Sequence, residues 1–187
     1  MPSETASLVI YAGAAVGLGT LIVAAFNAWK AVNWKRAELA STYLKELTSN
    51  QELVFACRAL EWSRGKLAVP ETLVPLLESE KRSIVHDAAA LERAMDRDRY
   101  LDQMDSDERL QIYRTSMDSL LSWLTLVAQA IERDLFQPKD LEEARYWVQM
   151  VTDRPFLNAF IDAYEYGQPL ALLRERYAVA PRRSRGA

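Results

Sequence analysis

The chain has 187 residues, of which 26 are acidic and 23 basic, and this near balance gives no overall field that would favour nucleic acid as a partner. Its one cysteine, Cys57, permits no internal disulfide and is expected to be a small buried side chain in a reducing compartment. Residues 30–187 are long enough to form one domain with a core of its own.

The first predicted element is a transmembrane helix over residues 8–29, which contain no charged side chain. A helix over these 22 residues is about 33 Å long, which matches the ~30 Å hydrocarbon core of a bilayer. Its apolar side chains favour insertion by roughly 3–5 kcal/mol. Two other interpretations are a cleaved signal peptide, with Val23-Ala24-Ala25 as the cleavage triplet, and a buried core helix. The first requires basic residues before the apolar run, and the sequence has none there. The second is usually interrupted by polar residues within about 10–14 positions, whereas residues 8–29 contain no charged side chain.

The charges on either side of the span predict its orientation. Residues 1–7 contain Glu4 but no Lys or Arg, whereas basic residues follow the span closely. Because Lys and Arg are retained in the cytoplasm, we expect residues 1–7 to form a short extracytoplasmic N-terminus and the C-terminal domain to be cytoplasmic. The residues expected to anchor the two interfaces are Tyr11, Trp29, Lys30, Trp34, Lys35 and Arg36.

Small residues lie along one edge of the predicted span. Gly13 and Gly17 form a GxxxG pair, and further small residues follow on the same helical edge. Such an edge lets a neighbouring helix approach closely, so it predicts self-association or docking to another span. The alternative is that small residues are common in spanning helices in general. The residues predicted to associate are Gly13, Gly17, Thr20, Ala24 and Ala28.

Residues 30–177 are predicted to form an all-α bundle, because apolar residues recur with the helical period and no convincing run of alternating β-branched residues is found. The anchor helix is expected to continue into this domain to about Leu47. Ser49 and Glu52 form a capping box for a second helix that ends near Gly65.

The later elements follow from prolines, caps and periodicity. Pro70 and Pro75 bracket a short helical turn or loop. The expected elements after it are a helix with Ile84, Ala88, Leu91 and Met95 on one face, a central helix over 110–135 capped by Asp105 and Glu108, a helix from Pro138 to before Pro155, packing residues from Phe156 to Gly167, a helix over 170–177, and a disordered basic tail over 178–187. The central helix is expected in the core and not in a membrane, because its uncharged part, residues 119–131, is only 13 residues long.

The sequence contains no motif for catalysis, cofactor binding or metal binding. It has no glycine-rich loop after a strand and no Cys or His pair at metal spacing, so no catalytic, cofactor-binding or metal residue is predicted. The acidic stretch over 96–108 departs from the calcium-loop pattern at the sixth and twelfth positions. It is therefore expected to be a solvated connection that caps helices.

One alternative function uses the only histidine, His86. A helix drawn through Ile84 and Ala88 places His86 and Arg82 on the exposed side. Arg82 and His86 weakly resemble the Arg-and-His motif of HEPN-type helical RNA-cleaving domains, although three residues separate them where the family spacing is longer. Lys81 has the family spacing but not the residue type. The resemblance implies a membrane-tethered ribonuclease in which the pair performs acid–base chemistry across a dimer interface.

As a whole the chain resembles an uncharacterised bacterial family of short single-span membrane proteins with a charge-poor N-terminus, a basic junction such as Trp34-Lys35-Arg36, and a helical cytoplasmic domain. The resemblance is one of layout, and it implies a location in the bacterial inner membrane. We predict a regulatory, scaffolding or accessory subunit whose partners are membrane lipid and another protein or a second copy. A homo-oligomeric membrane effector, pore-like or bilayer-perturbing and active in stress or phage defence, is the second alternative. The sequence identifies no small-molecule ligand.

Overall fold

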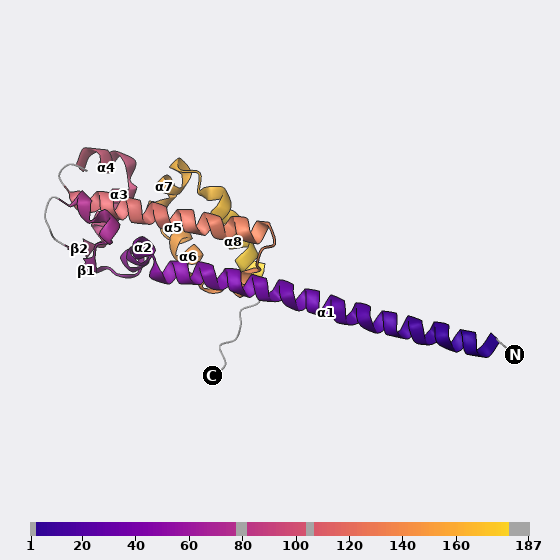
Figure 1. Ribbon diagram of the computed structural model, residues 1–187. Coiled ribbons are helices and arrows are strands. Elements are labelled where there is room, and N and C mark those ends of the chain that lie inside the picture. Colours follow the sequence, from indigo (N-terminus) through magenta and orange to yellow (C-terminus); the bar gives the residue numbers. More distant parts are fainter. Residues whose placement is uncertain (1–2, 78–81, 104–106, 180–187) are drawn as a thin grey trace, which may run out of the picture.

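The computed structural model describes the backbone of residues 3–77, 82–103 and 107–179, and the side chains of residues 19–77, 82–103 and 107–178. Its most prominent feature is a long first helix, α1, that projects far beyond a bundle formed by the rest of the chain (Figure 1). The elements in chain order are α1 (Ser3–Ser49), α2 (Gln51–Glu61), β1 (Arg64–Ala68), η1 (Glu71–Leu76), β2 (Ser83–Asp87), α3 (Ala88–Met95), α4 (Arg97–Gln103), α5 (Glu108–Glu132), η2 (Pro138–Asp140), α6 (Glu143–Thr152), η3 (Pro155–Leu157), α7 (Asn158–Ala163) and α8 (Gly167–Val179).

The predicted helical bundle is confirmed, and α5 lies at its centre. Helices α2, α3, α6 and α8 all pack against α5. Its middle is buried on nearly every side, as the apolar run in the sequence predicts, with Leu120, Leu121 and Leu124 fully enclosed. The predicted end of this helix near Leu135 is too late, because the helix ends at Glu132 and Leu135 lies in the following turn.

A β-hairpin replaces part of the predicted third helix. Strands β1 and β2 pair antiparallel, with Gly65 opposite His86 and Leu67 opposite Ile84. The burial of β2 alternates, because Ile84 and His86 face inward and Val85 faces outward. The prediction that Ile84 shares a helical face with Ala88 is therefore wrong: the helix begins only at Ala88, which is exposed.

Several helix ends differ from the predicted ones by a few residues. The cap of α2 is Asn50, whose side chain accepts from the backbone N–H of Glu52 at 3.0 Å, whereas Ser49 is the last residue of α1. Asp107 caps α5, and the predicted cap Asp105 lies outside the described residues. The predicted short helical turn is confirmed as η1, although it begins after Pro70 and contains Pro75 instead of ending before it.

The C-terminal half follows the predicted order. Helix α6 buries Leu141 before its start and Ala144, Val148 and Val151 within it, and it ends before Pro155 as expected. Helix α8 begins at Gly167, three residues earlier than predicted. Most of the predicted tail, residues 180–187, lies outside the described residues.

Candidate functional site

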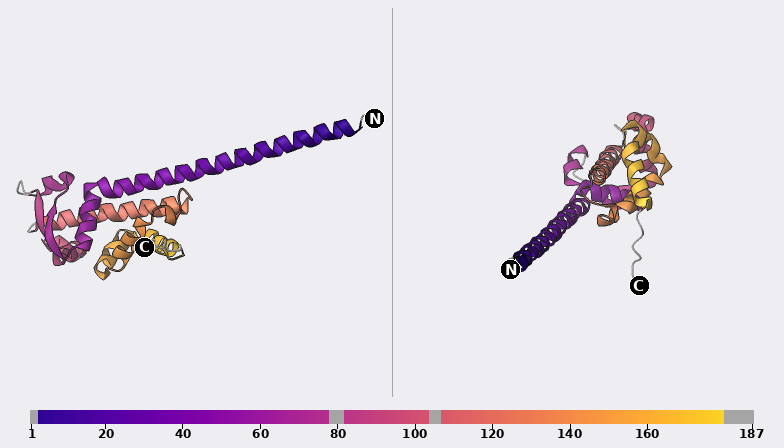
Figure 2. Two further views of the ribbon diagram at one scale, coloured as in Figure 1. Left: turned by 90° about the horizontal axis from the view of Figure 1, so that it is seen from below. Right: turned by 90° about the vertical axis from the view of Figure 1, so that its right-hand side faces the viewer.

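The part of α1 that projects from the domain carries large apolar side chains with no protein against them. Leu21 is 69% exposed and Trp34 is 74% exposed. In the two further views the helix leaves the domain as a rod, and no other element lies beside its projecting part (Figure 2). The large apolar residues exposed on it are Leu21, Ile22, Val23, Phe26, Trp29, Val32 and Trp34.

These side chains surround most of the helix. Successive helical residues are about 100° apart, so Leu21, Ile22 and Val23, which are all exposed, point in three different directions. The remaining arc, which we call the small arc, holds Thr20, Ala24 and Ala28. A helix that is apolar on nearly all sides is typical of a span or of the centre of a large protein.

Half of the predicted span falls outside the described side chains. Tyr11, Gly13 and Gly17 are among the residues whose side chains the structure does not describe. In the described part of the chain, no helix is both long enough and apolar enough to cross a membrane.

The other end of α1 is fixed to the domain by a joint with the turn after α5. Arg36 donates from Nη2 to the backbone carbonyl of Asp134 at 3.4 Å. The rings of Tyr43 and Phe136 meet edge to face, with centroids 5.3 Å apart. Ala40, one helical turn after Arg36, is buried, and burial raises the pKa of Tyr43. We call these contacts the α1 joint.

The predicted basic anchors separate into two groups. Lys30 and Lys35 are exposed on α1, as are Trp29 and Trp34. Arg36 is half-buried, because its guanidinium group reaches the turn of the α1 joint. A role for Arg36 in holding the domain could not be read from its position beside the predicted span.

The prediction that His86 is exposed is wrong. It is fully buried on β2, where Nδ1 lies 2.7 Å from the hydroxyl of Tyr113 and Nε2 lies 2.8 Å from the carbonyl of Trp62. A carbonyl oxygen only accepts, so Nε2 donates, and in the neutral imidazole Nδ1 accepts the Tyr113 proton. Arg82 is exposed directly before β2, and Lys81 lies outside the described residues.

This histidine is a structural link between three elements. Tyr113 comes from α5, and Trp62 follows the end of α2. Burial is the main cause that raises the pKa of the Tyr113 hydroxyl, so it remains a proton donor at neutral pH. Both ring nitrogens of His86 are used within the domain, which leaves neither available to a bound substrate.

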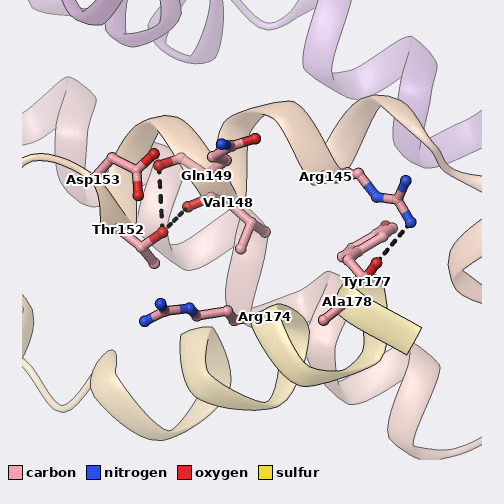
Figure 3. Close-up of a pocket in the computed structure, with 8 residues that line it drawn as sticks. All are labelled: Arg145, Val148, Gln149, Thr152, Asp153, Arg174, Tyr177 and Ala178. Carbon is pink, nitrogen blue, oxygen red and sulfur yellow. Dashed lines mark hydrogen bonds between the residues drawn. The ribbon is translucent and has the colours of Figure 1, made fainter. Parts of the chain in front are cut away.

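A pocket lined by several polar and charged side chains lies between α6 and α8 (Figure 3). The pocket has a volume of about 320 Å³. Arg145 donates to the backbone carbonyl of Tyr177 at 2.6 Å and pairs with Glu142 at 2.8 Å. Arg174 extends from α8 toward the end of α6, where Thr152 donates to the carbonyl of Val148 at 2.9 Å. These groups connect two helices, and no nucleophile lies beside a base among them.

The acidic stretch caps helices, as predicted. Asp96 accepts from the backbone N–H groups of Asp98 and Arg99 at 3.1 Å. Asp107 pairs with Arg109 at 2.7 Å, and this hydrogen bond is the largest of several contributions that lower the pKa of its carboxyl group. Among the residues that the structure describes, no group of three His, Cys, Asp or Glu could hold a metal ion.

Cys57 is buried in α2, as predicted, and burial raises the pKa of its thiol to about 12. A thiol with that pKa is almost entirely protonated at neutral pH and therefore a poor nucleophile.

Comparison of the chain with models of protein families, with curated proteins and with solved structures gave no match. A functional proposal for this chain therefore rests on its own sequence and geometry.

Proposed function

We propose that the protein is a single-pass membrane protein in which residues 8–29 of α1 cross the bilayer and the helical domain works at the cytoplasmic surface. The observation that carries the proposal is the projecting part of α1, with apolar side chains on most of its circumference and nothing packed against them. A sequence of 22 residues without charge, followed by basic and tryptophan residues, gives that helix a length suited to a bilayer.

Water is a poor environment for this helix. Fully burying one large apolar side chain is worth about 1.5–3 kcal/mol. Leu21, Ile22, Val23, Phe26 and Trp29 are each more than half exposed, so leaving them in water costs roughly 5–10 kcal/mol in total. Lipid removes that cost on every side of the helix at once, whereas one protein partner covers only one side.

The function that fits this arrangement is that of a regulatory, scaffolding or accessory subunit in the bacterial inner membrane. Confinement of the domain to a surface raises its effective concentration for partners on the same surface. The continuous helix and the α1 joint also hold the domain in one position relative to its anchor. The domain therefore acts by being held at a fixed position on the membrane surface, where it contacts its protein partners.

A homo-oligomeric membrane effector is the second candidate. The observation that favours it is the small arc of Thr20, Ala24 and Ala28, which continues the edge begun by Gly13 and Gly17 in the sequence. Two such edges can approach closely in lipid. The ribonuclease alternative requires a histidine that can reach substrate, and the burial of His86 gives it no support.

Protease protection of a doubly tagged chain tests the proposal. In vesicles with the periplasmic face outward, we expect protease to remove an N-terminal tag and to leave the domain and a C-terminal tag intact. In inverted vesicles the pattern reverses. Cleavage of both tags from the same face would contradict the topology. The mass of the intact complex in detergent then separates an accessory subunit, bound to a different protein, from a homo-oligomer.

A further inference from the structure

We propose that the turn after α5, residues 133–139, which includes the first two residues of η2, rests on the phospholipid headgroups beside the point where α1 enters the bilayer. The inference rests on the proposed function, because it requires α1 to be the anchor. It adds a second membrane contact, made by the domain itself, that fixes how the domain faces the membrane.

Helix α1 has no hinge between the anchor and the domain. No Gly or Pro occurs between Thr20 and Ser49, and the helix is continuous over this range. The domain therefore cannot swing freely about a linker, and its distance from the bilayer is set by the helix itself.

The α1 joint holds this turn against α1. Arg36 donates to the carbonyl of Asp134, and Tyr43 packs on Phe136, which is only 1% exposed. The turn is at the end of the domain from which α1 projects, whereas α4 lies at the opposite end (Figure 1). The end of the domain that carries the turn is therefore the end that faces the membrane.

Arg36, which holds the turn, lies a short distance along α1 from the predicted span. Arg36 is seven residues beyond Trp29, the last residue of the predicted span, which corresponds to about 10 Å of helix. The headgroup zone occupies roughly 5–7 Å of that distance. The remaining gap is within the reach of a leucine or arginine side chain on the turn.

The turn exposes one large apolar side chain and several charged ones. Asp134 adopts a left-handed conformation with φ of 54°, and after it Phe136 turns inward while Leu135 stays 46% exposed. Arg133 and Lys139 are exposed on the same turn, and such side chains place a charge among phosphates and a stem against lipid. Asp134 is exposed on the turn and Glu132, the last residue of α5, is exposed directly before it, so these four charges at this end of the domain sum to zero. The contact therefore depends on position and on Leu135, and we expect little dependence on salt.

A fluorophore attached at single engineered cysteines tests the contact. The native Cys57 is buried and its pKa is raised to about 12, so it stays unlabelled. The probe site is Leu135→Cys, and the matched control is Leu101→Cys, an exposed leucine (56%) on α4 at the far end of the domain. Phe26→Cys reports on the anchor.

Each labelled full-length protein is reconstituted in vesicles of phosphatidylethanolamine and phosphatidylglycerol that contain a lipid with a spin label near its headgroup. We expect quenching at 135 to be at least threefold greater than at 101. Equal quenching at 135 and 101, with strong quenching at 26, would overturn this inference and leave the anchor intact. No quenching at 26 would overturn the proposed function, and the inference with it.

Discussion

Replacement of Leu21 by arginine distinguishes between a first helix that lies in a membrane and one that lies in water, because the expected effects differ. Leu21 is 69% exposed, so the change removes almost no packing within the protein. In water, an exposed helical Leu→Arg substitution changes stability by no more than a few tenths of a kcal/mol. Leu21 is eight residues from Trp29, about 12 Å along the helix and close to the middle of a bilayer.

In lipid the same substitution is costly. Loss of the leucine and introduction of an arginine near the bilayer centre together cost about 3–4 kcal/mol, a factor of 10²–10³ in partition. That cost is similar to the roughly 3–5 kcal/mol by which the span favours insertion, so the net free energy of insertion of Leu21→Arg is close to zero. We expect the membrane-bound fraction to fall from nearly all of the protein to about half or less.

The assay is the fraction of protein that sediments with membranes after washing at alkaline pH. Leu101→Arg is the matched control, because Leu101 is also exposed but lies on α4, away from the anchor. We expect this control to sediment like the native chain. If Leu21→Arg also sediments like the native chain, the side chain of residue 21 does not lie in lipid, and the reasoning is refuted.

Three further predictions concern the domain and the association of the span. Tyr113→Phe leaves the buried imidazole acceptor unpaired and should lower the free energy of unfolding by about 1–3 kcal/mol in a urea titration, whereas Tyr146→Phe, at an exposed site, should change it by less than about 0.5 kcal/mol. A comparable loss in both variants would contradict the role given to the buried hydrogen bond. Asp107 has a lowered pKa in the folded state, so its contribution is present above pH ~4 and is lost as the pH falls through the folded value. The difference in thermal midpoint between the native chain and Asp107→Asn should therefore shrink toward zero in acid. A difference that stays constant with pH would contradict a stabilising contribution from the ionised Asp107 carboxylate. Leucine at both Gly13 and Gly17 should abolish crosslinked oligomers in membranes, and crosslinks of unchanged size would remove the support for the homo-oligomeric effector.

The helical core was predictable because its signal is long and periodic. The apolar positions of α5 repeat over many turns, so no other element fits them. The hairpin was missed because β1 and β2 have only five residues each. Ile84, Ala88, Leu91 and Met95 also fit a helical period, and the alternation of Ile84 and His86 about Val85 is too short to decide between the two.

The contacts that place the domain could not be predicted from the sequence. Arg36 and Asp134 are separated by 98 positions, and nothing local in either segment indicates the other. The sequence around Arg36 predicts an interfacial cation, which is a property of one helix. The pairing of Tyr43 with Phe136 likewise arises only when α5 and its turn pack beside α1.

The most direct test of the account is the distribution of the unmodified full-length chain after cell lysis without detergent. The account predicts that the chain remains with the membrane fraction through an alkaline carbonate wash, is released only by detergent, and retains its first 29 residues when its intact mass is measured. Full-length chain in the soluble fraction, or a mature chain that begins after Ala25, would contradict it.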